Sequence, residues 1–329
     1  MIQVAIVGTG NIGNTHARCY QANKNVKIIA VSDVLREKAD KAAAAYDCKA
    51  FSSVREMLAS GMRIDAASVA TAGKENGGDH YEPTMELLAA GIPVLGEKPI
   101  SNELSKAREM VALAKKKNIP YGINLNHRFT PAARRAREWL DAGQLGSLNI
   151  INMTMWINNP NESSPHFHMR ALHPHSIDVM RYFAGDVAKV QAFFKKGEGR
   201  KIWSNVQVNM LFANGVIGHL TGSYDAGGSY GLETCEIVGS KGRVVINEAC
   251  EQLSFYPRLS KEVEIYKHPG GMNSFPDTFQ SRIDAWIDDL LRKTPPDRVD
   301  GKAEDALKAQ QIIEAAIESW ETEKVITLS

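Results

Sequence analysis

The sequence predicts an α/β protein that begins with a doubly wound parallel sheet and continues into a second domain rich in strands. Three observations carry this prediction. The first half alternates near-continuous apolar runs with helical segments, the pattern of parallel strands buried on both faces. The glycine motif GTGNIG directly follows the first apolar run. The second half contains six strand-like segments and two hairpin-type turns.

Length and composition limit the kinds of protein this chain can be. Its 329 residues suffice for about two domains, each with its own core. A net charge of +1 and a pI near 7.7 give no electrostatic footprint for nucleic acid or an anionic membrane. The four cysteines are scattered without CxxC spacing, and we see no leader and no bilayer-length apolar run. We therefore expect a cytoplasmic protein.

The glycine motif and the second strand together form a dinucleotide-binding fingerprint. Gly8 makes the tight turn, Gly10 lets a pyrophosphate approach the backbone, and Gly13 lets helix and strand pack closely. The following helix offers its amide groups and partial positive charge to the phosphates. Asp33 ends the second strand, where it can accept hydrogen bonds from ribose hydroxyls and would repel a 2′-phosphate. NAD is therefore favoured over NADP, a preference that Arg36 could soften.

The first half alternates between strands and helices, with two successive helices before the third strand. Expected strands are residues 4–7, 27–33, 64–71, 92–99 and 120–126, and expected helices are residues 14–23, 36–47, 52–60, 80–91 and 105–118. Ligands of a doubly wound sheet gather at the carboxyl ends of its strands. The GEKP segment, residues 96–99, therefore lies on the cofactor edge.

The second half reads mainly as strands. They are residues 148–157, 187–195, 203–212, 215–224, 232–238 and 242–247, with turns at Asn214-Gly215 and Lys241-Gly242. We divide the chain into a Rossmann domain, residues 1–122, and a substrate-binding and oligomerisation domain, residues 123–329.

Taken together, GTGNIG with Asp33, then GEKP, then HSID resemble the Gfo/Idh/MocA oxidoreductases, which include inositol dehydrogenases and glucose–fructose oxidoreductase. The order and spacing agree along nearly the whole chain. The resemblance implies a C-terminal α+β domain with a large, mostly antiparallel open sheet, and a homodimer or homotetramer formed through that sheet. It also leaves open that the C-terminal tail packs back on the first domain.

The resemblance gives Lys98 a role beside the nicotinamide and the substrate hydroxyl, where an ammonium stabilises a developing alkoxide. The peptide bond before Pro99 is often cis in the family. The Glu97 side chain could orient Lys98 or simply point into the protein interior. A solvated lysine after a strand is the alternative. The complete expected cofactor-binding set is Gly8, Gly10, Asn11, Ile12, Gly13, Asp33, Arg36, Thr71, His80, Glu97 and Lys98.

A second cluster begins at HSID, which is similar to the family's H-x-x-D pattern. It implies that His175 takes the hydroxyl proton as hydride leaves the same carbon for NAD, and the ordinary imidazole pKa of about 6.5 suits that task. His175 should start a helix, which puts Asp178 on the same face. Asp178 would bind a substrate hydroxyl or hold the imidazole. Local hydrogen bonding at a helix start is the alternative for His175.

The chain departs from many of its relatives just before this histidine. Ala171 stands where they carry a carboxylate, and His173 stands where they carry a glycine. Asp178, His173 or Lys98 could replace the missing carboxylate, or the reaction could differ.

The four histidines at 166, 168, 173 and 175 lie within ten residues and also suggest a metal, because a His-x-His segment on a strand can put two imidazoles on one face. Zinc sites usually add cysteine or carboxylate ligands, so we expect no metal and favour hydrogen bonds to a polyol. The expected substrate-binding residues are Asn126, Arg128, Trp156, His168, His173 and Asp178. His127 lies within the same NHR segment, Arg128 could instead be a structural ion-pair residue, and Tyr224 and Tyr230 could add to an apolar wall.

The sequence favours an NAD-dependent dehydrogenase acting on a secondary alcohol of a sugar or cyclitol. The alternative is a redox-neutral glycosidase or lyase that retains NAD and works through a transient 3-keto sugar. A non-catalytic nucleotide sensor is the third hypothesis, although a sensor needs neither Lys98 nor His175. The loop at residues 72–80, with Gly77-Gly78, could act as a flap over the cofactor or be a surface insertion.

Overall fold

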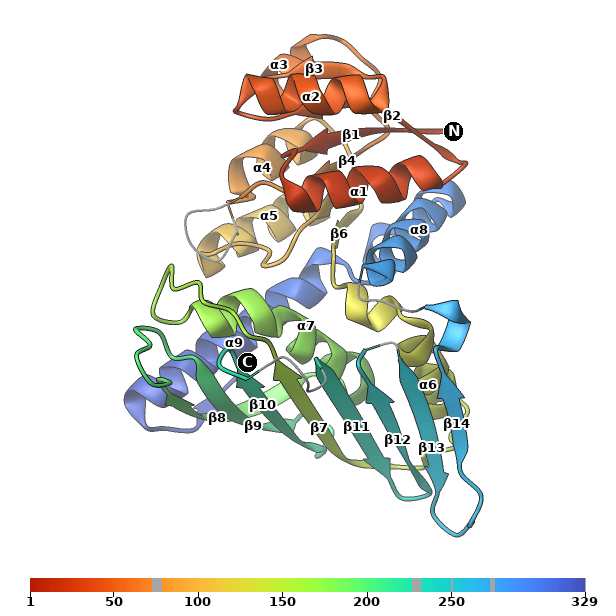
Figure 1. Ribbon diagram of the computed structural model, residues 1–329, viewed down its shortest axis with the longest axis vertical. Coiled ribbons are helices and arrows are strands. Elements are labelled where there is room, and N and C mark those ends of the chain that lie inside the picture. The colour runs from red at the N-terminus through yellow and green to blue at the C-terminus, as the bar shows by residue number, and fades with distance from the viewer. Residues whose placement is uncertain (73–78, 227–231, 250, 273–275, 329) are drawn as a thin grey trace. The chain divides into compact units, whose positions relative to one another are not determined.

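The computed structural model describes residues 1–72, 79–226, 232–249, 251–272 and 276–328 (Figure 1). The chain forms two compact units. The first unit is Met1–Leu125 with Phe279–Lys308, and the second is Asn126–Thr278 with Ala309–Ser329. The glycines of the proposed flap, Gly77 and Gly78, and the wall residue Tyr230 lie outside the described residues.

The first unit contains the predicted parallel sheet, with strand order β3-β2-β1-β4-β5-β6. Its strands are β1 (Ile2–Val7), β2 (Val26–Ser32), β3 (Lys49–Phe51), β4 (Ala66–Val69), β5 (Val94–Gly96) and β6 (Tyr121–Ile123). Its helices are α1 (Asn11–Ala22), α2 (Arg36–Tyr46), α3 (Val54–Ala59), α4 (Tyr81–Ala89) and α5 (Leu104–Lys117), with most of α8 (Asp277–Arg292), η3 (Pro296–Arg298) and the start of α9 (Ala303–Thr322). All neighbouring strands pair in parallel.

The register of this sheet brings several loops to one edge. Val7 is level with Ser32 and Val69, Val69 is level with Gly96, and Gly96 is level with Ile123. The residues that follow these strand ends therefore share the carboxyl edge, where ligands bind in such sheets.

Apolar side chains cover both faces of the parallel sheet. One buried cluster joins the strands to α3, α4 and α5, and another joins them to α1, α2 and α8. Trp286 of α8 is fully buried in the second cluster. This two-sided burial explains why the strands appear in the sequence as continuous apolar runs.

The second unit is built on a nine-stranded sheet of order β14-β13-β12-β11-β7-β10-β9-β8-β15. Its strands are β7 (Leu148–Trp156), β8 (Val187–Lys195), β9 (Asn205–Phe212), β10 (Ile217–Ser223), β11 (Glu233–Gly239), β12 (Gly242–Asn247), β13 (Gln252–Pro257), β14 (Glu264–Lys267) and β15 (Ile326–Thr327). It also contains η1 (Asn126–Phe129), α6 (Pro131–Asp141), α7 (Phe167–Ala184), η2 (Pro269–Gly271) and the end of α9. Only the β7–β10 pair among these neighbours is parallel, so the predicted mostly antiparallel sheet is confirmed.

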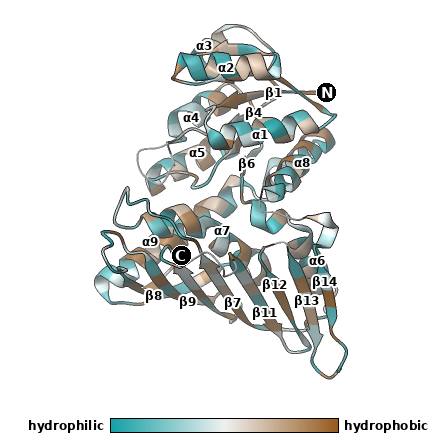
Figure 2. Cartoon of the chain, in the orientation of Figure 1, coloured by the Kyte–Doolittle hydropathy of each residue, from teal (hydrophilic) through white to brown (hydrophobic). Residues whose placement is uncertain are grey.

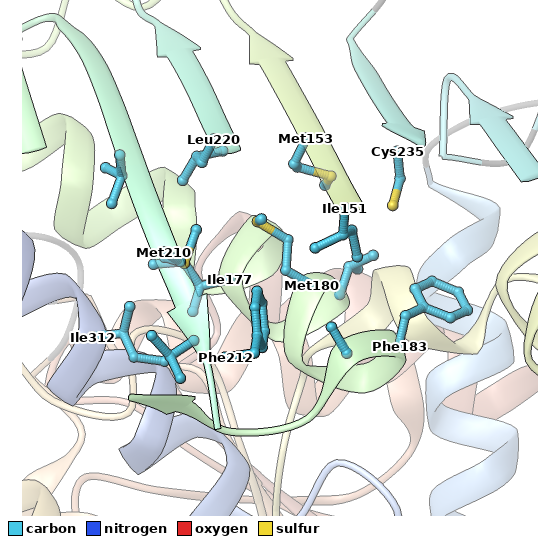
Figure 3. Packing of buried hydrophobic residues seen from close by; sticks show 14 of the residues in the cluster. Ile151, Met153, Ile177, Met180, Phe183, Met210, Phe212, Leu220, Cys235 and Ile312 are labelled. Carbon is cyan, nitrogen blue, oxygen red and sulfur yellow. The ribbon is translucent and has the colours of Figure 1, made fainter. Parts of the chain in front are cut away.

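One face of this second sheet packs against helices. Figure 3 shows Met153 of β7, Leu220 of β10 and Phe212 of β9 with Ile177 and Met180 of α7 in one apolar cluster. Side chains on β8 and β9 alternate between buried and exposed, and hydropathy varies along the same strands in Figure 2. The strands therefore have one apolar face and one face that is accessible in this chain.

The structure corrects some predicted elements. Strands β3, β13 and β14 were not predicted. β3 has three residues, β13 has three consecutive buried residues, and all four side chains of β14 are exposed, so none of them shows an alternation to recognise. The second predicted hairpin turn lies one residue earlier, at residues 240–241. Gly242 itself belongs to β12, where an added Cβ would lie 2.7 Å from a ring carbon of Phe255.

Candidate functional site

The glycine loop between β1 and α1 has the geometry of a phosphate-binding turn. Gly8 has φ +87°, and an added Cβ there would lie 2.7 Å from the Ala70 carbonyl oxygen. A Cβ on Gly13 would lie 1.8 Å from the Gly8 carbonyl oxygen, whereas a Cβ on Gly10 would meet nothing within 4 Å. Helix α1 starts after Gly10 without a side-chain cap. The loop therefore leaves open space and helix-start amides for a dinucleotide phosphate.

Asp33 follows β2 and is tied to this loop. Its Oδ2 accepts hydrogen bonds from the Thr9 amide at 2.8 Å and the Thr9 hydroxyl at 2.9 Å, and its Oδ1 accepts from the Leu35 amide at 2.9 Å. Partial burial favours a raised pKa for Asp33, but these hydrogen bonds outweigh it and lower the pKa. A fixed carboxylate thus stands beside the glycine loop. The Arg36 guanidinium instead pairs with Asp40 in an exposed i,i+4 ion pair at 2.9 Å.

Glu97 is the centre of a buried polar network at the end of β5. Its Oε1 lies 2.8 Å from Nε2 of His16 and accepts a 2.5 Å hydrogen bond from the side-chain amide of Asn124. Its Oε2 accepts a hydrogen bond from the backbone amide of Lys98. The other ring nitrogen of His16 lies 2.6 Å from the Ser68 hydroxyl. Burial favours a raised pKa for Glu97, but His16, Lys98 and Asn124 together lower it. Glu97 thereby ties α1, β4, β5 and the end of β6 together.

Lys98 is half-buried and precedes Pro99 through a cis peptide bond, as the family resemblance implied. Burial lowers the pKa of the Lys98 ammonium, and the Glu97 carboxylate opposes this shift. Lys98 thus differs from the solvated lysine that was the alternative prediction, because its environment restricts its contact with water.

His80 and Thr71 form part of the wall next to this strand end. The buried His80 ring lies between two carbonyl oxygens, with Nδ1 3.0 Å from Pro99 O and Nε2 3.0 Å from Thr71 O. Burial lowers the pKa of His80, against the opposing effects of Glu97 and the two carbonyl groups. The Thr71 hydroxyl donates to the Asp79 carbonyl at 2.6 Å. His80 therefore links the segment after β4 to the segment that carries Lys98.

In the second unit, His175 lies inside α7 rather than at the start of a helix. The helix begins at Phe167, earlier than predicted, and continues through Pro174. The proline concealed this continuity, because a proline usually marks a helix start or a break. The His175 side chain is buried, with 5% of the residue exposed.

The ring of His175 stacks on the ring of His127, which lies in η1. Their centroids are 4.3 Å apart and their planes differ by 14°. Nδ1 of His127 lies 2.5 Å from the buried Glu233 carboxylate at the start of β11. Glu233 was not predicted from the sequence, and the signal that could have shown it is its place in the same alternation as the buried Cys235 and Ile237 of that strand.

Asp178 lies three residues after His175 and forms a bidentate ion pair with Arg128. The Arg128 Nε donates to Oδ2 at 2.7 Å, and its Nη2 donates to Oδ1. The guanidinium also lies 5.2 Å from the centroid of the Tyr182 ring. Both members of the pair are buried. The side-chain amide of Asn126, in the same η1 turn, donates to the Thr278 hydroxyl at 2.5 Å.

The remaining histidines of the cluster lie at the start of α7 and within it, so they do not have the strand geometry that the metal alternative considered. His166 precedes α7 and its Nε2 lies 3.1 Å from Glu321. His168 and His173 face each other with Nε2 atoms 3.1 Å apart. Burial lowers the pKa of His168 to about 3 and that of His173 in the same direction, so both are neutral at ordinary pH. Among the described residues, no group of three or more histidines, cysteines or carboxylates could hold a metal ion.

The aromatic residues of the predicted apolar wall differ in burial. Tyr224 packs in a small core cluster with Met155, Leu172 and Ile202, and its ring lies 4.4 Å from that of His168. Trp156, at the end of β7, is half-buried. Core packing therefore accounts for Tyr224.

Two family models match this chain. Residues 2–125 match the oxidoreductase family with an NAD-binding Rossmann fold, and residues 133–245 match the Gfo/Idh/MocA C-terminal domain. The chain is thus an oxidoreductase whose first unit is an NAD-binding Rossmann fold. It belongs to the Gfo/Idh/MocA family, which confirms the predicted resemblance and the predicted cofactor.

The individual relatives have low sequence identity to this chain. The sequence is 26% identical to the rhizopine catabolism protein MocA of Rhizobium meliloti over 56% of this chain, and the match spans only 57% of MocA. It is 24% identical to inositol 2-dehydrogenase of Rhizobium meliloti (strain 1021) over 74% of each chain. The solved complex of levoglucosan dehydrogenase with NADH and levoglucosan has the same fold, with a TM-score of 0.87, 20% identity and 99% coverage of both chains. Within the described part of the chain, no helix is long and apolar enough to cross a membrane.

Proposed function

We propose that this protein is an NAD-dependent dehydrogenase that oxidises a secondary alcohol of a sugar or cyclitol. The observation that carries the proposal is Lys98, a half-buried lysine directly after β5 at the cofactor edge, whose backbone amide donates to the buried Glu97 carboxylate. The substrate class follows from relatives that are named for inositol and levoglucosan. NAD, when bound, provides the acceptor for the hydride that leaves the substrate carbon.

Two side chains of the chain would handle the substrate hydroxyl. His175 takes the hydroxyl proton as a general base, a role suited to an imidazole shielded from bulk water. The Lys98 ammonium stabilises the negative charge that develops on the oxygen as the C–H bond breaks. Asp178 is bound bidentately by Arg128, so we assign this pair to shaping the substrate pocket around His175.

The test is a screen of cyclitols, free sugars and glycosides with NAD⁺, followed by the absorbance of NADH. We expect sustained NADH formation with at least one polyol. Absence of NADH formation across all three substrate groups would refute a dehydrogenase of this class.

A redox-neutral glycosidase or lyase is the second candidate, because Ala171 provides no carboxylate one helical turn before His175. Such an enzyme would oxidise the substrate transiently, expel a glycosidic group and return the hydride. In the same screen it would release free sugar from glycosides without a lasting absorbance change. Product analysis by chromatography therefore separates the two candidates.

We also propose that a second copy of this chain covers the open face of the second sheet. On this face Phe193 and Ile217 are more than half exposed, and a hollow of about 420 Å³ is bordered by Leu211, Ile217, His219 and Val325. An exposed apolar sheet face of this kind favours association. Sedimentation should give a dimer or tetramer, and Ile217→Asp should shift it toward the monomer. A wild-type monomer at micromolar concentration would contradict this proposal.

A further inference from the structure

The stacked pair His127–His175 gives the proposed base a defined ring orientation. A centroid distance of 4.3 Å with planes 14° apart is a parallel stack rather than a chance edge contact. The two rings come from different elements, η1 and α7. A rotation of the His175 ring about its Cβ–Cγ bond would therefore break the stack or require His127 to move.

His127 is itself fixed by a buried carboxylate. Its Nδ1 lies 2.5 Å from Oε2 of Glu233, and the two residues are 3% and 2% exposed. Glu233 is anchored at the backbone, because it pairs with Met155 of β7 and its carbonyl accepts from the Glu248 amide. The carboxylate therefore has a fixed origin in the sheet, and it fixes the edge of the His127 ring that it contacts.

The position one turn before His175 in α7 carries no carboxylate. The side chain four residues before His175 is the methyl group of Ala171, which cannot form a hydrogen bond. Asp178, on the following turn, accepts hydrogen bonds from Arg128 with both carboxylate oxygens. The Glu233–His127 pair could orient His175 in place of such a carboxylate. It would do so by stacking on the face of the His175 ring rather than by a hydrogen bond at the ring edge.

We propose that His127, held by Glu233, is a positioning residue that fixes the plane of the His175 imidazole. The consequence for catalysis rests on the proposed function, because it requires His175 to be the general base. The orientation itself is a property of the second unit and can be measured without substrate. A general base misplaced by about 1 Å loses on the order of 100-fold in rate, so a ring that holds it has a measurable effect.

The experiment compares variants that separate the ring from its carboxylate. His127→Gln keeps a hydrogen-bonding group near Glu233 but removes the ring. The double variant His127→Phe with Glu233→Gln keeps a ring to stack and leaves no buried charge unpaired. The control is His268→Asn, at an exposed site after β14 with φ 46°, a backbone conformation that asparagine tolerates.

The first readout is the NMR spectrum of the His175 ring protons in each protein. The wild type should show a ring-current shift from His127, which should disappear in His127→Gln and persist in the double variant and the control. An unchanged His175 shift in His127→Gln would overturn the proposal. This readout also detects a variant that fails to fold, because its whole spectrum would collapse.

The second readout is steady-state turnover with the substrate found in the screen. His127→Gln should lower kcat by about 10- to 100-fold with KM and the NAD dissociation constant near wild type, and the double variant should recover part of the loss. Equal kcat values for wild type and His127→Gln would overturn the catalytic part while leaving the dehydrogenase proposal intact. If the wild type forms no NADH at all, the proposed function fails, and the NMR comparison still decides whether His127 positions His175.

Discussion

A buried histidine–glutamate pair occurs in each of the two units. One pair fixes a segment of backbone, and the other contacts the side chain of a second histidine. In the Rossmann unit, His16 contacts Glu97 with one ring nitrogen and Ser68 with the other. That ring is bound at both edges, so the pair fixes the backbone that precedes Lys98. In the second unit, the His127 ring is bound to Glu233 at one edge and presents a face to His175.

This difference shows that a histidine–glutamate pair can either connect backbone segments or restrain the side chain of a neighbouring residue. The outcome depends on which part of the imidazole is engaged. Ring edges form hydrogen bonds that tie strands together, whereas a ring face restrains another aromatic ring. If the two pairs differ as their geometry indicates, changes to each pair should affect different properties of the protein.

The largest effect is expected from removing the ring that the second pair supports. His175→Ala should lower kcat by about 10²- to 10⁴-fold, because it removes the proposed acid/base group. The NAD dissociation constant, measured by fluorescence titration, should stay near wild type. Wild-type turnover in this variant, with His268→Asn as the control, would remove the catalytic role from the second unit.

Neutralising the two carboxylates one at a time compares the pairs directly. Glu97→Gln should reduce the free energy of unfolding in urea by about 1–3 kcal/mol, because a charged buried hydrogen-bond network is lost. It should also weaken NAD binding, since the segment before Lys98 is no longer tied to α1. Glu233→Gln should leave NAD binding unchanged and lower kcat. Identical behaviour of the two variants would show that the pairs do not differ in function.

Acid should destabilise the protein through the neutral histidines of α7. The pKa of His168 falls from its ordinary 6.5 to about 3 in the folded state because of burial. Between these values the unfolded chain binds the proton and the folded chain does not. The free energy of unfolding should therefore fall by about 1.4 kcal/mol per pH unit per such group as pH drops below about 6.5.

Urea unfolding at several pH values between about 4 and 8 measures this slope. His168→Gln should flatten it, because an amide can still donate to His173 but does not take up a proton. His268→Asn should leave the slope as in the wild type. An unchanged slope in His168→Gln would mean that other groups cause the acid sensitivity.

The smallest effect is expected at the coenzyme ribose. Asp33→Ala removes the carboxylate held by Thr9 and Leu35, and it should relax the preference for NAD over NADP by about 10-fold, the worth of one charge contact of about 1.4 kcal/mol. The ratio of kcat/KM for the two coenzymes measures it. If the wild type already prefers NADP, the assignment of Asp33 is wrong.

Much of the first unit could be predicted because its signals are local. Gly8, Gly10 and Gly13 follow one strand directly, and Asp33 directly follows the next, so turn geometry and strand order place them together. The strand β14 and the early start of α7 could not be predicted, because exposed side chains and an internal proline carry no usable local signal.

The sequence by itself determined the two kinds of sheet, the coenzyme motif and the position of Lys98 at a strand end, because periodicity and turn residues act over a few neighbours. Only the tertiary structure decided the partners of the buried polar side chains. Glu97 meets His16 across 81 positions of the chain, and His127 meets Glu233 across 106. Such pairings depend on which strands and helices pack together, and a buried charge finds its partner only once that packing exists.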